Sequence, residues 1–462
     1  MNTDEALRIH EASLALLEDP GICLEHEGIC ARLLKAGAKT GVDAQVIRFP
    51  RELVAEYLTL VPSEVRFADR REGGYTIRPT GGSRIWSVPG MYLFRHREHR
   101  RFRAADMADM ARLLDGLPEV DGVFGLSMED IPPLAGDVVG LRIMAENTTK
   151  HIRVLCCTPE GADLLCEMRD VVADAPWFSI GFTAHGPLSW THLALEIFAR
   201  TAGRGIPTTV NGEPMAGVSA PTTLAGAAAV GNAEILAGLV VNQVLDPGRP
   251  CVYNLGLGHV FDMRTGIAVT GAPENHLFAE ISAVMGRFYD IPSCSWVSTE
   301  SMCPDSQAAL EKSVGYLAHL QSGVSLVWGV GQLESELTIS PAQALIDNEI
   351  LGYVRRYLRG FDVTEETLAV DVTRAVGIRG NYLTEEHTLR HFRTELFQPG
   401  LLFRQRRPIW KAEGGRSLWQ AAEAQADELI GREQPDLLPE EQQRALREIE
   451  RAYTADADLG HG

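Results

Sequence analysis

The sequence alternates between short apolar runs and longer amphipathic segments, and this alternation constrains the fold more than any other feature. Each of seven apolar runs is followed by a segment with helical periodicity. Because the runs lack polar alternation, both faces of the sheet they form are expected to be buried, as in parallel sheets. The predicted strands are Val123–Ser127, Ile152–Cys157, Phe178–Phe182, Pro207–Asn211, Cys251–Leu255, Ser293–Val297 and Val324–Gly329.

This series of strand–helix units predicts an α/β fold, a (β/α)₈ TIM-type barrel spanning residues 118–360. No G-x-G-x-x-G follows the first strand, so a dinucleotide-binding sheet is not supported. The eighth strand is left open between Glu336–Ser340 and a piece of the N-terminal region. Residues 1–117 are expected to form an extension of helices and short strands. Residues 361–462 are expected to form a C-terminal helical segment that packs on the barrel or forms an oligomer contact.

One apolar stretch, Ser219–Leu245, is long enough to cross a bilayer, which takes about 20 residues. Asn232 and Glu234 would then lie near the bilayer centre, where a charge costs roughly 2.5–3.5 kcal/mol on insertion scales. The stretch ends at Asp246-Pro247-Gly248, which is typical of a helix stop. We therefore expect a helix buried against protein and no membrane partner.

Composition narrows the partners and the compartment. The formal net charge of −19 disfavours binding to a phosphate backbone and leaves room for a cationic small molecule. Eight cysteines occur without a C-x-x-C pair, and the opening residues MNTDEALRIH do not form a signal peptide. These features predict a reduced, cytoplasmic protein that does not bind nucleic acid.

Polar residues follow several predicted strands, where the active site of a barrel lies. Asn211 and Glu213 follow the fourth strand, and Glu213 is expected to face the barrel mouth, although it would alternatively cap the helix that follows. His185, His259 and Glu300 follow other strands, each with the alternative of an ordinary loop hydrogen bond. Acids gathered in a cavity suit a cationic ligand.

Aromatic residues favour the same kind of ligand. Tyr253, Trp296 and Trp328 lie on neighbouring strands, and Trp86 lies in the N-terminal region. An aromatic face contributes roughly 0.5–2 kcal/mol to binding a quaternary ammonium, and the alternative role is filling of barrel layers. His and Cys residues show no ligand spacing, so no metal site is expected.

Several long motifs resemble the trimethylamine methyltransferase superfamily. The resemblance runs from about His10 to Trp419. The motifs are "GEPMAGVSAPTTLAGAAAVGNAEILAGLVVNQVLDPGRPCVYN", "GLGHVFD", "DMRTGIAVTGAPE", "PDSQAALEK", "LIDNEILGYVRRYLRG" and "NYLTEEHTLRHFR". The segment "STESMCPD" departs from the family pattern, which bears on the identity of the substrate.

The resemblance implies a barrel that moves a methyl group from a quaternary amine, such as glycine betaine, to the cobalt of a corrinoid carried by a partner protein. The founding enzymes carry pyrrolysine, whereas every residue here is standard, which implies the non-pyrrolysine branch. The catalytic candidates are Glu213, Asn211 and His259, and a donor carboxylate would meet Arg264, His259 or His185. A homo-oligomer is expected.

Two alternatives stay open at this point. The chain would use another methyl donor or carrier, or it would bind cationic osmolytes without catalysis.

Overall fold

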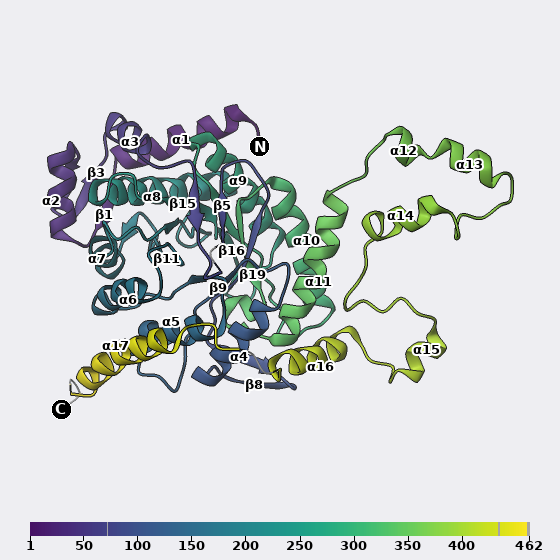
Figure 1. The fold of residues 1–462 in the computed structure, drawn as a ribbon. Helices are drawn as coiled ribbons and strands as arrows, with labels where there is room; N and C mark the ends of the chain where they lie inside the picture. Colours follow the sequence, from purple (N-terminus) through teal and green to yellow (C-terminus); the bar gives the residue numbers. More distant parts are fainter. Residues whose placement is uncertain (72, 433–434, 460–462) are drawn as a thin grey trace.

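A closed barrel of eight parallel strands forms the centre of the molecule (Figure 1). The computed structural model describes the whole chain except residues 72, 433–434 and 460–462. In order around the barrel the strands are β6 (Arg84–Ser87), β9 (Gly122–Phe124), β10 (His151–Arg153), β11 (Phe178–Thr183), β13 (Thr208–Asn211), β15 (Cys251–Gly256), β18 (Ser293–Trp296) and β19 (Leu326–Val330). Seven of these coincide with the predicted strands, and the predicted (β/α)₈ fold is confirmed.

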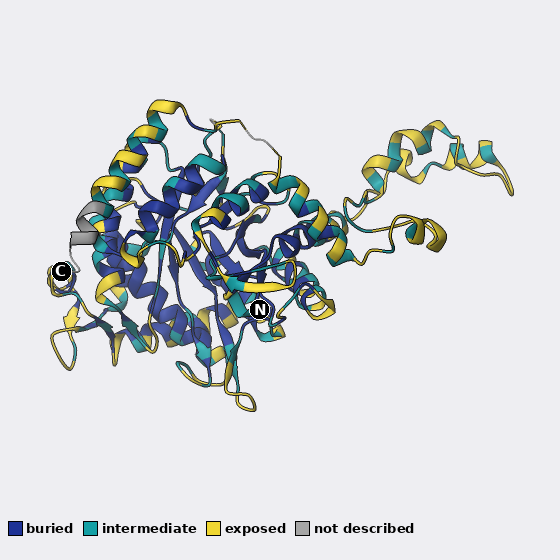
Figure 2. Ribbon diagram, turned by 90° about the horizontal axis from the view of Figure 1, so that it is seen from below, coloured by how far each residue is buried: buried dark blue, intermediate teal, exposed yellow. Residues whose placement is uncertain are grey.

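A helix follows every barrel strand and covers its outer face. These helices are α4 (Ala104–Asp115), α5 (Gly136–Asn147), α6 (Pro159–Val172), α7 (His192–Arg200), α8 (Leu224–Leu245), α9 (Pro273–Tyr289), α10 (Ser306–Ser322) and α11 (Pro341–Leu358). In Figure 2 the strands and the inner sides of these helices are buried, as the continuous apolar runs require.

The eighth strand, β6, comes from the N-terminal region, so the barrel begins before residue 118. β6 is only the four residues RIWS, and it pairs with β19 on one side and β9 on the other. The other alternative, Glu336–Ser340, instead contains β21 (Thr338–Ile339), which lies in a separate small sheet. A four-residue segment carries too little periodicity to be recognised alone, and its pairing is fixed by tertiary contacts.

The long apolar helix α8 lies inside the protein. It is the one described helix long and apolar enough to span a membrane, and 78% of its apolar window is buried by the rest of the chain. α1 (Thr3–Glu18) and α3 (Arg51–Leu58) pack along it. Its Asn232 amide donates to Ser13 Oγ at 2.8 Å and accepts from the Tyr253 hydroxyl at 2.7 Å. The predicted buried helix is confirmed.

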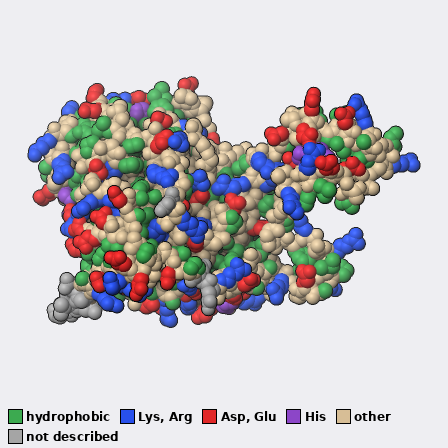
Figure 3. All heavy atoms as spheres, viewed as in Figure 1, with side chains coloured by type: hydrophobic (Ala, Val, Ile, Leu, Met, Phe, Trp, Pro, Cys, Tyr) green, Lys and Arg blue, Asp and Glu red, His purple; other side chains and the backbone are tan. Residues whose placement is uncertain are grey.

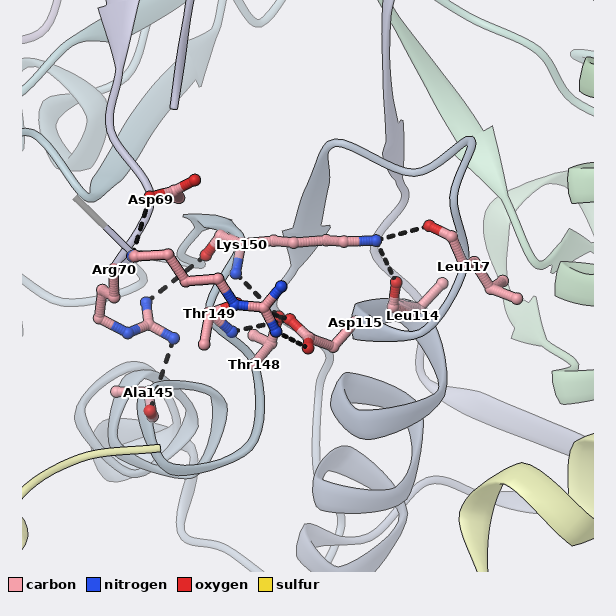
Figure 4. A network of polar contacts seen from close by, with 10 residues as sticks. Asp69, Arg70, Leu114, Asp115, Leu117, Ala145, Thr148, Thr149 and Lys150 are labelled. Atoms are coloured by element: carbon pink, nitrogen blue, oxygen red, sulfur yellow. Dashed lines mark hydrogen bonds and ion pairs between the residues drawn. The ribbon is translucent and has the colours of Figure 1, made fainter. Parts of the chain in front are cut away.

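The hairpin of β4 (Val65–Phe67) and β5 (Tyr75–Ile77) covers the amino end of the barrel, which we call the bottom. The other N-terminal elements, α2 (Glu27–Ala36), β1 (Ile22–Leu24), β2 (Lys39–Thr40) and β3 (Val46–Arg48), join β12 (Ser189–Trp190) beside α8. A polar network ties the β4–β5 hairpin to the turn before β10 (Figure 4). In it Lys150 Nζ donates to two helix-end carbonyls, Leu114 at 2.7 Å and Leu117 at 2.6 Å. Asp115 accepts from the Thr148 hydroxyl and the Thr149 amide, both at 2.8 Å.

Two small sheets border the opposite end, which we call the mouth. One contains β14 (Met215–Ala216), β16 (His259–Asp262) and β17 (Ile267–Val269), from the loops after β13 and β15. The other contains β7 (Tyr92–Arg95), β8 (Glu98–Arg101), β20 (Gln332–Leu333) and β21, from the loops after β6 and β19.

The C-terminal region divides into a packed part and a projecting part. α16 (Leu418–Ile430) packs on α11 and α4, and α17 (Glu440–Leu459) packs on α5 and α6. The segment between α11 and α16 stands away from the barrel (Figure 1), except where Phe397 packs on Tyr353 and Gly400 donates to Glu349, both on α11. It contains α12 (Glu365–Leu368), α13 (Val370–Val376), α14 (Glu386–Glu395) and α15 (Arg407–Ala412). The expected packing on the barrel therefore does not extend to residues 361–394, for which the alternative of an oligomer contact stays a prediction.

Candidate functional site at the barrel mouth

Two tryptophans on neighbouring strands form an aromatic wall near the mouth. Trp296 ends β18 and stands in register with Trp328 on β19, and the two residues are 3% and 4% exposed. Phe124 meets the Trp328 ring edge-to-face, with centroids 5.0 Å apart. Neither indole Nε1–H finds a hydrogen-bond partner among the described residues. Since buried indoles usually have a partner, both donors are available to a ligand.

The other two predicted aromatics lie elsewhere. Trp86 is fully buried, stacks on His151, and donates its indole N–H to the Tyr75 hydroxyl from the bottom hairpin. Tyr253 points outward to α8, because residues alternate along a strand and Asn254 points inward. The structure therefore gives both residues packing roles and does not bring them to the mouth.

Two carboxyl groups at the mouth, those of Glu213 and Glu336, are close enough to interact electrostatically. Desolvation raises the pKa of Glu213 to about 7. Desolvation and then the charge of Glu213 raise the pKa of Glu336 to about 8. The Glu213 side chain is 35% exposed, although the residues packed around it remove much of its hydration. Two like charges in one cavity favour a shared proton or a bound cation.

Glu213 does not cap the following helix. Among the described residues it forms no hydrogen bond, and the N-cap position of α8 is occupied by Thr223, which makes no side-chain capping bond. The His259 Nδ1 lies 3.9 Å from Glu213 Oε1 and bonds instead to the Leu257 carbonyl at 3.0 Å. Burial lowers the pKa of His259, which leaves its ring neutral beside the carboxyl.

The loop that carries Glu336 has an unusual backbone. Glu334, Ser335 and Glu336 all have positive φ angles, of 53°, 50° and 83°. Such conformations cost of order 1–3 kcal/mol each and persist only where surrounding contacts impose them. Here the Ser335 amide donates to the Thr299 carbonyl at 3.0 Å, and the Ser335 hydroxyl donates to Glu300.

A buried ion pair supports the start of the same loop. Lys312 and Asp347 have fully buried side chains and lie 3.1 Å apart. Lys312 also donates to the Gly329 carbonyl at 2.5 Å, and Asp347 accepts from the Gly331 amide at 2.8 Å. This pair fixes the turn after β19, from which Gln332 and the three strained residues project.

A chain of amides runs along the strands next to the tryptophans, because β15 pairs directly with β18. Asn254 Nδ2 donates to Asn211 Oδ1 at 3.0 Å, and Asn211 Nδ2 donates to the Thr183 hydroxyl at 3.2 Å. Asn254 Oδ1 and Gln332 Oε1 have no partner among the described residues. The predicted residue Asn211 therefore holds Asn254, which presents a free acceptor.

Three other predicted residues do not join this group. Glu300 accepts from the backbone of Thr270 at 2.6 Å and of Gly271 at 2.8 Å, so it holds the mouth loops together. Arg264 lies at the tip of the β16–β17 hairpin, is 90% exposed and pairs with Asp262. His185 is exposed in the loop after β11.

The sequence analysis missed Arg153, the last residue of β10. Its side chain is 5% exposed, and its guanidinium lies 5.3 Å from the centroid of Phe124, the ring that also touches Trp328. No described carboxylate lies within ion-pair distance of it, and its Nε has no partner. Burial lowers its pKa to about 10, so it keeps its charge at neutral pH. An uncompensated buried cation is costly, which points to an anionic ligand.

Gly181 lies beside the Arg153 guanidinium, and its lack of a side chain makes room for that group. A Cβ at Gly181 on β11 would collide with Arg153 Nη2 and with Thr209 Oγ1, and Thr209 Oγ1 is itself unpartnered among the described residues. Arg153 and Thr209 thus offer donors near the aromatic wall, while Glu213 and Glu336 offer negative charge at the mouth. A signal was present in the sequence, because Arg153 interrupts the apolar run "HIRVL".

These features define a (β/α)₈ barrel that carries two inward-facing tryptophans and a pair of acidic residues in the loops after its strands. A family model described as trimethylamine methyltransferase matches residues 1–455. The chain belongs to this methyltransferase family. Trimethylamine methyltransferase MttB of Desulfitobacterium hafniense (strain DSM 10664 / DCB-2) is 30% identical over 96% of this chain and 92% of that protein.

Two further similarities agree with membership of this methyltransferase family and with the barrel fold. The glycine betaine methyltransferase of Desulfitobacterium hafniense (strain Y51) is 27% identical over 89% of this chain and 88% of that protein. The crystal structure of the Methanosarcina barkeri monomethylamine methyltransferase MtmB matches 93% of this chain and 87% of that chain, with a TM-score of 0.55 and 13% identity. The structural match supports the barrel fold.

Proposed function

We propose that this methyltransferase demethylates a quaternary amine that also carries a carboxylate, such as glycine betaine, and passes the methyl group to a corrinoid protein. The observation that carries the proposal is the buried Arg153, which has no described carboxylate partner and lies beside Phe124, the ring that touches Trp328. Trp296 and Trp328, with the acids Glu213 and Glu336, would form the cation site. The similarity to a glycine betaine methyltransferase supports the same donor class.

The two charged subsites give the donor one orientation. The carboxylate would lie inward, against Arg153 and Thr209, and the trimethylammonium group outward, against the indole faces. Phe124 spans the two subsites, because it touches both Arg153 and Trp328. In this orientation one N-methyl group points out of the mouth, where a carrier can reach it. Arg153 takes the role that the sequence analysis gave to Arg264, His259 or His185.

The protein's own contribution is positioning. A corrinoid cobalt in its Co(I) state would supply the nucleophile. As the methyl carbon is transferred, the C–N bond breaks, its electron pair stays on nitrogen, and a neutral tertiary amine leaves without a proton. Trp296, Trp328 and Arg153 hold the methyl group in line and exclude water. The negative charge of Glu213 and Glu336 stabilises the bound cation, an interaction that weakens as the positive charge is lost.

The rim of the mouth fits a protein carrier better than a cofactor resident in this chain. Each of four mouth loops exposes apolar side chains: Val218, Met263 and Ile267, Met302, and Leu337 are between 42% and 69% exposed. Corrinoid docking on this apolar rim is therefore part of the proposal. The eight cysteines are all free, which supports a cytoplasmic location. A homo-oligomer is also proposed.

A methyl-transfer assay tests the donor. The purified chain is mixed with Co(I) cobalamin, and methylcobalamin is followed by its absorbance with glycine betaine, choline and trimethylamine as donors. We expect turnover with glycine betaine and a much higher KM with choline, which shares the trimethylammonium group but has no carboxylate. Equal use of choline and glycine betaine would remove the Arg153 subsite from the proposal. Turnover of none of the quaternary amines would overturn it.

A further inference from the structure

The projecting segment of the C-terminal region has no core of its own. We call residues 361–394 the arm. Every residue between Phe361 and Ala412 is at least partly exposed. In Figure 2 this segment shows no buried surface, in contrast to the barrel. The arm nevertheless exposes large apolar side chains, among them Ile378 at 98%, Phe361 and Leu383 at 79%, and Leu389 at 63%.

Only a few contacts at the surface connect the helices of the arm. Glu366 on α12 pairs with His391 on α14 at 3.0 Å, and the same carboxylate pairs with Arg390 at 3.2 Å. At its base Arg356 of α11 donates to the Glu395 carbonyl at 2.7 Å. The helices of the arm have 4, 7 and 10 residues. Isolated helices shorter than about 12–15 residues are marginal in water, so ion pairs at the surface do not suffice to hold them.

A second apolar face lies on the body beside the root of the arm. On α10, Leu310 and Val314 are four residues apart and 65% and 47% exposed. On α11, Tyr353 and Tyr357 are likewise four apart and 54% and 67% exposed. Between the two helices runs a groove of about 420 Å³ lined by Leu317, Ile346, Ile350 and Leu402. In Figure 3 the arm projects from the body. The apolar side chains of the arm therefore do not cover the apolar face on α10 and α11.

We propose that the arm of one molecule docks on the α10–α11 face of a second copy, whose arm docks in return. A two-fold axis then covers both apolar faces with one contact made twice. A different partner on either face would leave the other exposed to water. A corrinoid protein must also leave after each methyl transfer, whereas extended apolar faces are typical of permanent interfaces.

A complementation experiment tests the exchange. One variant carries Ile378→Asp and Leu389→Asp on the arm, and another carries Leu310→Asp and Tyr357→Asp on the body. In a dimer of either variant alone, each of the two arm-to-body contacts contains one mutated face. The dimer dissociation constant of each variant should therefore rise by about 100-fold or more. Mixed together, the two variants can form a heterodimer in which one contact is entirely wild type. Native mass spectrometry should therefore show the wild-type chain as a dimer, each variant as a monomer, and the mixture as heterodimer.

The controls separate the outcomes. Val42→Asp changes another apolar residue, 81% exposed in the N-terminal region, and should stay dimeric. Circular dichroism should show that all variants stay folded. A monomeric wild-type chain at micromolar concentration, or a mixture without heterodimer, would overturn the proposal. If the wild-type chain and the arm variant are both monomers and the arm variant alone loses methyl transfer to the corrinoid protein, the proposal is overturned and the arm is assigned to that partner instead. The oligomeric readout needs no methyl donor, so it does not depend on the proposed reaction.

Discussion

The barrel treats the same kinds of residue in opposite ways on its bottom and mouth sides, even between Trp86 and Trp328, which are paired in register on β6 and β19. At the bottom, Trp86 donates its indole N–H to Tyr75, and His151 has hydrogen-bond partners for both ring nitrogens, the Ala68 carbonyl and the Ser179 hydroxyl. At the mouth, Trp296 and Trp328 have free indole N–H groups among the described residues. The bottom thus completes its polar contacts on folding, whereas the mouth leaves them for a ligand. This difference predicts that substitutions at the bottom change stability and substitutions at the mouth change donor binding.

The largest expected effect is at the bottom. Phe67 is fully buried and packs edge-on against Trp86 and His151. Phe67→Ala should lower the free energy of unfolding by about 3–5 kcal/mol, because a buried ring leaves a cavity. Urea denaturation measures this change, and donor kinetics at a temperature where the variant stays folded should give an unchanged KM. A raised KM for glycine betaine in the folded variant would mean that the two ends are coupled.

Removal of the buried Arg153 charge should weaken donor binding and change stability little, the reverse of Phe67→Ala. In Arg153→Gln, the donor binding free energy should fall by about 2–4 kcal/mol for glycine betaine, because its carboxylate loses a desolvated partner. The free energy of unfolding should fall by no more than about 1 kcal/mol, since the guanidinium has no carboxylate partner among the described residues.

Choline is the matched control for Arg153→Gln. Because choline lacks the carboxylate, its KM should be nearly the same in wild type and variant. Arg264→Gln at the exposed hairpin tip should leave the kinetics of both donors unchanged. Equal losses for choline and glycine betaine would show that Arg153 only shapes the cavity.

Sequence periodicity predicted the barrel because seven of its strands are uninterrupted apolar runs, each followed by a helix. It did not place β6, whose four residues become a strand only between β19 and β9. The position of Glu213 followed from the rule that strands end at the mouth. The assignment of Tyr253 and Trp86 to the site failed because the direction of a side chain depends on strand register. Register is fixed by the neighbouring strands, which the sequence does not show.

Arg153, Glu336 and the arm were not recognised from the sequence because their roles also depend on tertiary structure. Arg153 reads as part of an apolar run until the strand alternation turns it inward. Glu336 follows β19 by several residues, and only the three positive φ angles return it towards Glu213. The arm reads as ordinary amphipathic helices, because the sequence does not show that its apolar residues face away from the body.

The acid pair offers a pH-dependent test of the mouth. Its raised pKa values mean that the folded state holds protons that the unfolded state has lost, so stability should fall as pH rises from about 4.5 to about 8. Binding of a cationic donor favours the ionised pair, so KM for glycine betaine should fall by up to about tenfold from pH 6 to pH 8. In Glu213→Gln, we expect a higher KM at pH 8 with a smaller change in kcat, and a flatter pH profile. An unchanged profile would remove Glu213 from the cation site.

The smallest expected effect compares two tryptophans of the same barrel. Trp328→Phe keeps an aromatic face but removes the free indole N–H and weakens the attraction to a cation, so donor binding should fall by about 0.5–1.5 kcal/mol. Trp86→Phe removes an indole N–H that is already bonded to Tyr75, so it should lower the free energy of unfolding by about 1–3 kcal/mol and leave KM unchanged. Measuring KM for glycine betaine and unfolding by urea on both variants gives four values. Only a crossed pattern, with binding lost in one variant and stability in the other, agrees with a bottom completed on folding and a mouth completed by its ligand.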